Sequence, residues 1–137
     1  MVTSSHPKPL VIFEMANNHM GSLASGDKAL MDEVCAFLGK RGLFFLDSRT
    51  TAQTVAEREA ARLGLPHAKR DVFLDDQVEP KAILKQLDRA LSLAKKQGYA
   101  VAIGHFKAVT LDTLLKAIPK IQEEGVQLVY LSEVVGD

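Results

Sequence analysis

The chain has 137 residues, of which 47% are hydrophobic and 25% charged. This length and composition suit one globular domain with its own core and exclude a disordered chain. Seventeen basic residues balance seventeen acidic ones, so no overall field draws the chain to nucleic acid or to an anionic membrane. The single cysteine, Cys35, excludes an intrachain disulfide. We interpret it as a buried core residue, with a reactive thiol as the alternative.

No signal peptide is visible, and no apolar run approaches the roughly 20 residues that a membrane span needs. We therefore expect a cytoplasmic protein with no membrane partner. The first nine residues, MVTSSHPKP, are polar and contain two prolines. We interpret them as a frayed lead-in to a single α/β domain that spans residues 1–137.

The first half of the chain alternates strand-like and helical patterns. The apolar run LVIFEMA predicts a first strand. Residues 25–41 follow with helical spacing of Leu30, Val34, Phe37 and Leu38, which predicts a first helix with these side chains in the core. LFFLD then predicts a second strand, and a second helix follows Thr51 as its N-cap.

The second half continues the alternation. AKRDVFLD predicts a third strand, and a third helix opens at Glu79-Pro80, because proline is favoured at the first helical position. YAVAIGH predicts a fourth strand, and Thr110 is the expected N-cap of a fourth helix that contains Pro119. VQLVYLS predicts a fifth strand. Each helix is followed by a glycine that can take the left-handed conformation ending a helix, at Gly42, Gly64, Gly98 and Gly125.

The strand-like runs are mostly continuous apolar stretches, which is typical of strands covered on both faces. Strands that alternate with helices pair in parallel through right-handed crossovers. We therefore predict an α/β fold with five mostly parallel strands and four helices. The pattern leaves open whether the strands form an open sheet or a partial (β/α) barrel.

Polar residues gather at the predicted carboxyl ends of the strands, where parallel α/β folds bind ligands. His19 and His105 suit metal binding or general acid catalysis, because imidazole serves both roles near neutral pH. Asp47 could complete a metal site or orient an imidazole, and Arg49 and Arg70 could clamp a carboxylate. As alternatives, Asp47 could only cap the next helix, and Arg70 and Asp71 could form only an ion pair.

From residue 17 onward the chain resembles the divergent polysaccharide deacetylase family, in the segments NNHMGS, KRGLFFLDSRTTAQTVAEREAARLGLPHAKRDVFLD, AIGHF and LVYLSEVV. The resemblance implies a distorted (β/α) barrel and metal-assisted removal of acetyl groups. His19 matches a metal-ligand histidine, and His105 matches the histidine near the catalytic acid. The other polar motif positions fall on Asp47, Arg49, Arg70 and Asp71. Phe106 departs from the proline expected after that histidine.

Other parts of the family pattern have no counterpart in the sequence. The family carries a paired-aspartate motif, which supplies the general base and a metal ligand, in a half that precedes the NNHMGS segment. The opening PLVIFEMANNHMGS resembles instead the sialic acid synthase family, in which the glutamate matching Glu14 lies in the sugar site. Asn17 and Asn18 follow it in a segment that both families share. We interpret the chain as a chimera of the two families, with a natural truncated relative as the alternative.

These resemblances predict barrel-derived fragments without catalytic turnover. The alternatives are a residual metal-binding or carbohydrate-binding module that uses His19, Asp47 and His105, and a deacetylase completed by oligomerisation. We expect no required cofactor, although the resemblance implies a divalent metal such as zinc, and a carbohydrate is the candidate ligand. Five strands cut from a barrel leave two open strand edges, so we predict a homodimer.

Overall fold

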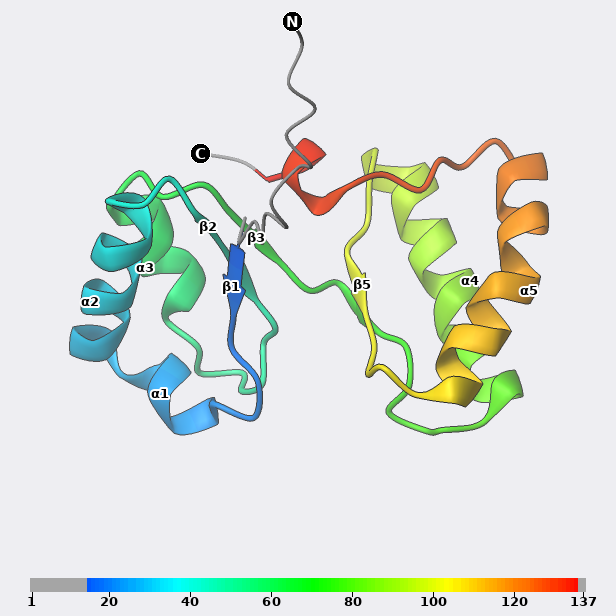
Figure 1. Ribbon diagram of the computed structural model, residues 1–137, viewed down its shortest axis with the longest axis horizontal. Coiled ribbons are helices and arrows are strands. Elements are labelled where there is room, and N and C mark those ends of the chain that lie inside the picture. The colour runs from blue at the N-terminus through cyan, green and yellow to red at the C-terminus, as the bar shows by residue number, and fades with distance from the viewer. Residues whose placement is uncertain (1–14, 136–137) are drawn as a thin grey trace, which may run out of the picture.

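The computed structural model describes residues 15–135 (Figure 1). In chain order, its elements are β1 (Met15–Asn17), α1 (Ser22–Gly26), α2 (Lys28–Gly39), β2 (Phe44–Asp47), α3 (Ala56–Arg62), β3 (His67–Lys69), β4 (Val72–Phe73), α4 (Pro80–Gln97), β5 (Ala102–Ile103), α5 (Ala108–Glu123) and the short 3-10 helix η1 (Leu131–Glu133). Every strand pair is parallel. The described residues form two open sheets and no closed barrel, which confirms the predicted α/β class.

The two sheets are connected at the junction between β3 and β4. The first has the order β1-β2-β3, and the second pairs β4 with β5. Between β3 and β4 lie only Arg70 and Asp71. The Arg70 amide donates to the Asp47 carbonyl at 2.9 Å, and the Asp71 amide donates to the Val101 carbonyl at 2.8 Å. The run AKRDVFLD, predicted as one strand, therefore contains two short strands that belong to different sheets.

Each sheet has its own helices (Figure 1) and one core cluster of its own, and a third cluster, with Leu46 and Val101, joins the two sheets. Helices α1, α2 and α3 lie beside the first sheet, and α4 and α5 lie beside the second. In α2 the buried stripe is Met31, Cys35 and Leu38. Of the four side chains predicted to face the core, Leu38 is buried and Val34 packs against the core, whereas Leu30 and Phe37 are 41% and 53% exposed, so the prediction was wrong for these two. Burial raises the pKa of the Cys35 thiol, as expected for a core cysteine.

Several helix boundaries follow local signals. Helix α4 begins at Pro80 with Glu79 as its N-cap, as predicted. The predicted first helix is divided into α1 and α2 at Asp27, whose carboxylate accepts a hydrogen bond from the Leu30 amide at 3.1 Å. Positive φ angles, which glycine adopts at little cost, occur at all four expected positions, Gly42, Gly64, Gly98 and Gly125.

Two predicted N-caps are wrong. Helix α3 begins at Ala56 with Val55 as its N-cap, so Thr51 lies outside it. Helix α5 begins at Ala108, and Thr110 lies within its first turn. The Thr110 hydroxyl donates instead to the Asp75 carboxylate at 2.8 Å, because a buried acceptor from another part of the chain is within its reach.

The predicted fifth strand, VQLVYLS, is also wrong. Residues 126–130 pair with no strand among the described residues, and residues 131–133 form η1. This segment runs from α5 back across the molecule in Figure 1. Its end packs Leu131, Val134 and Val135 against a core cluster that contains Leu46 and Val101. Within the run itself, Leu131 is partly covered, whereas Leu128, Val129 and Tyr130 are 61%, 49% and 80% exposed. Within residues 15–135, no helix combines the length and the apolar character that crossing a membrane requires.

Candidate functional site

A cleft of about 870 Å³ lies at the carboxyl ends of the strands and takes residues from both sheets. Six residues that the sequence predicts for the site line it, namely Asn17, Asn18, His19, Arg49, Arg70 and His105. Asp47 and Asp71 do not line it. Glu14 lies outside the described residues. The topology thus collects side chains from positions 17 to 105 at one edge of the fold.

A buried carboxylate holds His105 at the floor of the cleft. The Asp75 side chain is 0% exposed, and its Oδ1 lies 3.1 Å from Nδ1 of His105. Its Oδ2 accepts hydrogen bonds from the His105 amide at 2.9 Å and from the Thr110 hydroxyl at 2.8 Å. A Cβ atom at Gly104 would lie 3.5 Å from Asp75 Oδ1 and 3.3 Å from Thr110 Cγ2, so a glycine before the histidine favours this close packing.

The protonation of this pair follows from its contacts. Burial alone would raise the pKa of Asp75, but the hydrogen bonds from Thr110 and from the His105 amide and ring lower it overall. Asp75 is therefore an ionised acceptor at neutral pH. An ionised carboxylate accepts hydrogen bonds only, so Nδ1 of His105 carries the proton that faces it. The other ring nitrogen, Nε2, is then left to exchange a proton.

Two more rings surround His105. The ring of His19, which follows β1, meets it edge-on with 5.7 Å between centroids. The Phe73 ring meets it edge-on from β4 at 5.4 Å. The contact between the histidines joins the end of the first sheet to the end of the second, and the side chain of His105 remains 40% exposed.

Asn18 and Asp47 tie the loops of the first sheet together. Asn18 donates to the Ser25 hydroxyl at 2.7 Å and to the Asp47 carboxylate at 3.1 Å, and its carbonyl oxygen accepts from the Ser48 amide. Asp47 is buried and also accepts from the Arg49 amide and the Thr54 hydroxyl. Both side chains direct their hydrogen bonds into the protein, which agrees with a positioning role.

Arg70 and Asp71 point to different parts of the fold. Arg70 donates from Nε to the Ser48 carbonyl at 2.7 Å and from Nη2 to the Arg49 carbonyl at 3.0 Å, so it braces the loop after β2. Asp71 accepts from the Val101 amide at 2.8 Å, at the start of the β5 region. The ion pair between Arg70 and Asp71, an alternative on sequence grounds, does not form in the described structure.

Backbone strain and exposed apolar side chains mark the same region. Met20 and Arg49, with φ of 50° and 51°, are the non-glycine residues with positive φ between positions 15 and 135, and both line the cleft. Such conformations are uncommon for side chains of this size and occur preferentially at functional sites. Met20 is 86% exposed, and Phe106, directly after His105, is 99% exposed.

The described residues do not fit a self-contained metal centre. Zinc sites take three or four protein ligands, from histidine, cysteine or acidic side chains. Over residues 15–135 no three such side chains are grouped to hold an ion. His19 and His105 lie together, while the nearby carboxylates of Asp47 and Asp75 already accept hydrogen bonds.

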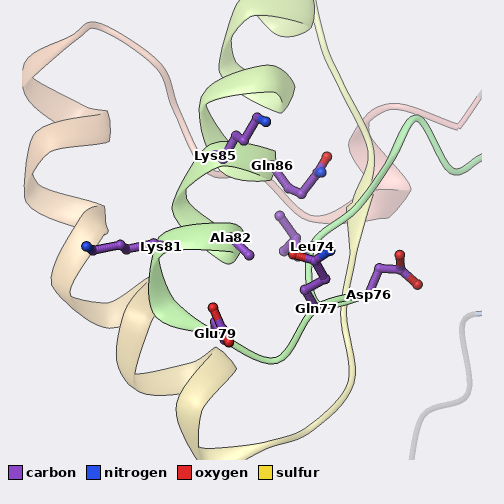
Figure 2. Close-up of a pocket in the computed structure, with 8 residues that line it drawn as sticks. All are labelled: Leu74, Asp76, Gln77, Glu79, Lys81, Ala82, Lys85 and Gln86. Carbon is purple, nitrogen blue, oxygen red and sulfur yellow. The ribbon is translucent and has the colours of Figure 1, made fainter.

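A smaller pocket of about 380 Å³ adjoins the cleft at the start of α4 (Figure 2). It shares Asp76 and Gln86 with the cleft. Lys81 and Lys85, both from α4, also line it and point in different directions in Figure 2. None of the site residues predicted from the sequence lies in it.

Two site residues were missed as candidates, Asp75 and Arg89. Asp75 ends a strand-like run as Asp47 does, so its position at a strand end was visible. Its pairing with His105 was not visible, because 30 residues separate the two. Arg89 lies on α4 and carries no signal in the sequence that distinguishes it from other exposed helix residues.

The fold and the cleft define an α/β protein with a histidine-aspartate pair at the carboxyl edge of its strands. The chain belongs to the divergent polysaccharide deacetylase family, whose pattern matches residues 11–135. The match covers nearly all of the opening segment that resembles the sialic acid synthases. The comparisons give no support to a second family, a chimera or an engineered origin, because one family accounts for both parts.

Similar proteins extend well beyond the matched region. An uncharacterized protein of Haemophilus influenzae is 40% identical over 118 residues, which cover 86% of this chain and 42% of that protein. The uncharacterized protein YibQ of Escherichia coli is 36% identical over 121 residues, covering 88% and 38%. The crystal structure of an uncharacterized protein from Agrobacterium tumefaciens superposes with a TM-score of 0.87 at 26% identity, covering 89% and 50%. The chain thus spans about half, or less, of the length of these relatives.

Proposed function

We propose that the cleft is part of a carbohydrate deacetylase centre, in which it binds an acetylated sugar and presents His105 as the general acid. The observation that carries this proposal is the pair of Asp75 and His105 in a cleft of ligand size. The family supports a carbohydrate ester or amide as the substrate class.

The pair suits the departure of a sugar oxygen or nitrogen from an acetyl group. After water has added to the acetyl carbon, the bond from that carbon to the sugar oxygen or nitrogen breaks, and His105 in its protonated form supplies the proton that the leaving atom needs from Nε2. The imidazole then returns to its neutral form, still oriented by Asp75 at Nδ1. General acid catalysis of this kind typically contributes about 10²–10⁴-fold to a rate. The loops that Arg70 and Asn18 brace hold the other polar groups beside the bound sugar.

For the chain alone we propose binding without rapid turnover. The resemblance assigns the general base and further metal ligands to a paired-aspartate segment that has no counterpart in this sequence. In the longer relatives, such groups would come from the part outside the aligned region. We expect zinc to bind this chain weakly, with His19 as a ligand.

Calorimetry with a short oligomer of N-acetylglucosamine tests the binding, with the fully deacetylated oligomer as the control ligand. We expect the acetylated oligomer to bind more tightly, and His105→Gln to weaken its binding. Failure of the acetylated oligomer to bind refutes the proposal. Acetate release that increases with added zinc and is lost in His105→Ala would show that the chain is a complete enzyme, contrary to the proposal of slow turnover.

We also propose a homodimer. In the two described sheets, β1 and β5 each lie at an outer edge, and a strand edge presents unpaired amide and carbonyl groups. The net charge of zero gives little repulsion between copies. Light scattering coupled to size exclusion tests this: a mass close to the 15.0 kDa of one chain at micromolar concentrations would refute it.

A further inference from the structure

Three arginines from separate parts of the chain converge on the cleft. Arg49 comes from the loop after β2, Arg70 from the junction between β3 and β4, and Arg89 from α4. One carboxylate, Asp76, lines the same cleft. The histidines aside, three positive charges therefore face one negative charge, in a chain whose basic and acidic residues are equal in number.

These arginines have no carboxylate partner in the described part of the chain. The ion pairs found there involve other cations. Arg70 uses Nε and Nη2 on backbone carbonyls. Arg49 and Arg89 are exposed. The carboxylates of Asp47 and Asp75 are buried and do not line the cleft, and their oxygens are occupied by other donors.

Grouped positive charges repel one another, and the repulsion is relieved when an anion binds between them. Guanidinium groups also present a planar fork of donors that matches carboxylate and phosphate oxygens. A neutral sugar would use hydroxyl and amide groups and would leave this charge uncompensated.

We propose that the carbohydrate bound in the cleft is anionic, and that Arg49 and Arg89 hold its charged group. This inference rests on the proposed function, because it specifies the substrate class of the same cleft. The anion is a carboxylate, as in a uronic acid, or a phosphate ester. Arg70, which is already engaged with the loop, adds charge and keeps Arg49 in place.

Calorimetry with matched ligands tests the proposal. An oligomer that alternates N-acetylglucosamine with glucuronate is compared with a neutral N-acetylglucosamine oligomer of the same length, and N-acetylglucosamine phosphate is compared with N-acetylglucosamine. We expect the acidic member of at least one pair to bind about tenfold more tightly, as for a charge-assisted hydrogen bond. The pair with the larger difference identifies the anion as carboxylate or phosphate. Added salt should reduce this difference.

Two variants of α4 complete the experiment. Arg89→Gln should remove most of the preference for the acidic ligand, because it should weaken binding of the acidic ligand far more than binding of the neutral one. Lys81→Gln removes a positive charge from the same helix but lies outside the cleft (Figure 2), so it should leave the preference intact. Equal affinities within both pairs, or an equal loss in both variants, would overturn the anionic ligand while the proposed function stands. If no acetylated ligand binds at all, both proposals fail.

Discussion

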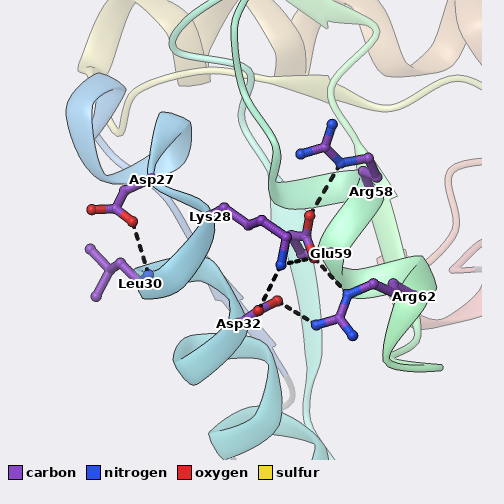
Figure 3. A network of polar contacts seen from close by, with 7 residues as sticks. All are labelled: Asp27, Lys28, Leu30, Asp32, Arg58, Glu59 and Arg62. Carbon is purple, nitrogen blue, oxygen red and sulfur yellow. Dashed lines mark hydrogen bonds and ion pairs between the residues drawn. The ribbon is translucent and has the colours of Figure 1, made fainter.

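Two buried carboxylates, Glu59 and Asp75, are stabilised in different ways. Glu59 lies in α3 with its side chain 1% exposed, and three cations surround it (Figure 3). Its oxygens lie 2.8 Å from Arg62 Nε, 3.1 Å from Arg58 Nε and 3.4 Å from Lys28 Nζ. Asp75, below the cleft, receives a hydroxyl, a backbone amide and one imidazole, and none of these carries a permanent charge.

The difference separates a structural role from a chemical one. The cations around Glu59 are charged at every physiological pH and compensate its negative charge. One of them, Lys28, links α3 to α2. Hydrogen bonding, above all from Arg62, lowers the pKa of Glu59 despite the opposing effect of burial. The charge of Asp75 is stabilised by neutral donors and remains able to stabilise a protonated His105. The general acid proposed at His105 therefore depends on a carboxylate that has no permanent cation beside it.

The largest expected effect on stability is that of Asp75→Ala. The change leaves the Thr110 hydroxyl and the His105 amide without their acceptor, and each unsatisfied buried group costs about 1–3 kcal/mol. We expect the free energy of unfolding to fall by about 2–4 kcal/mol in urea denaturation. Asp76→Ala is the matched control, because Asp76 is exposed and should contribute little. Equal losses in both variants would contradict the buried role of Asp75.

Glu59→Gln should have the next largest effect. It removes the charge that three cations share, and those cations, being half exposed or more, recover part of their hydration. The loss of stability should shrink at high salt, where ion pairs are screened in the wild type as well, whereas the loss in Asp75→Ala should not. Glu57→Gln, on the same helix in an exposed pair with Lys69, is the control. A loss in Glu59→Gln that does not depend on salt would refute the ion-pair account.

Acid should weaken the Glu59 network through a third carboxylate, Asp32. The hydrogen bonds from Lys28 and then Arg62 lower its pKa from 3.8 to about 2. Because the folded-state pKa is below the unfolded one, the stabilisation is complete above about pH 4 and is lost as the pH falls toward 2. We expect Asp32→Asn to flatten the decline of unfolding free energy over that range. An unchanged slope would show that other groups control acid unfolding.

The smallest expected effect is that of Arg89→Gln on stability. Arg89 is exposed and lies outside every ion pair of residues 15–135, so its loss should change the free energy of unfolding by less than about 0.5 kcal/mol. Urea denaturation without ligand checks this. A loss as large as that of Glu59→Gln would place Arg89 among the structural cations and remove the contrast between the two regions.

The sequence predicted the parts of the fold that depend on local signals. Pro80 at the start of α4 and glycine after the helices act within a few residues, and both were found. The alternating order of strands and helices also predicted correctly that His19 and His105 lie at the same edge. These inferences need only the spacing of apolar residues along the chain and the common direction of parallel strands.

Features that depend on distant partners could not be predicted. Thr110 looked like an N-cap because nothing nearby shows that Asp75, 35 residues earlier, takes its hydroxyl. The run VQLVYLS has strand composition, yet whether it pairs depends on an available neighbouring edge. The division of AKRDVFLD at Arg70 and Asp71 likewise depends on the positions of β2 and β5.

That division has a mechanical consequence for the cleft. The chain passes from the first sheet to the second between Lys69 and Val72, so the two sheets meet at this junction. His19 follows a strand of the first sheet, and His105 follows a strand of the second. A small rotation at this junction would change the distance between the two imidazoles, and it would also have to shift the core cluster of Leu46, Ala68 and Val101 that both sheets share. A ligand held at once by Arg49 and Arg89 would connect the two sheets. Its binding would therefore fix the position of His105, the proposed proton donor, relative to the first sheet.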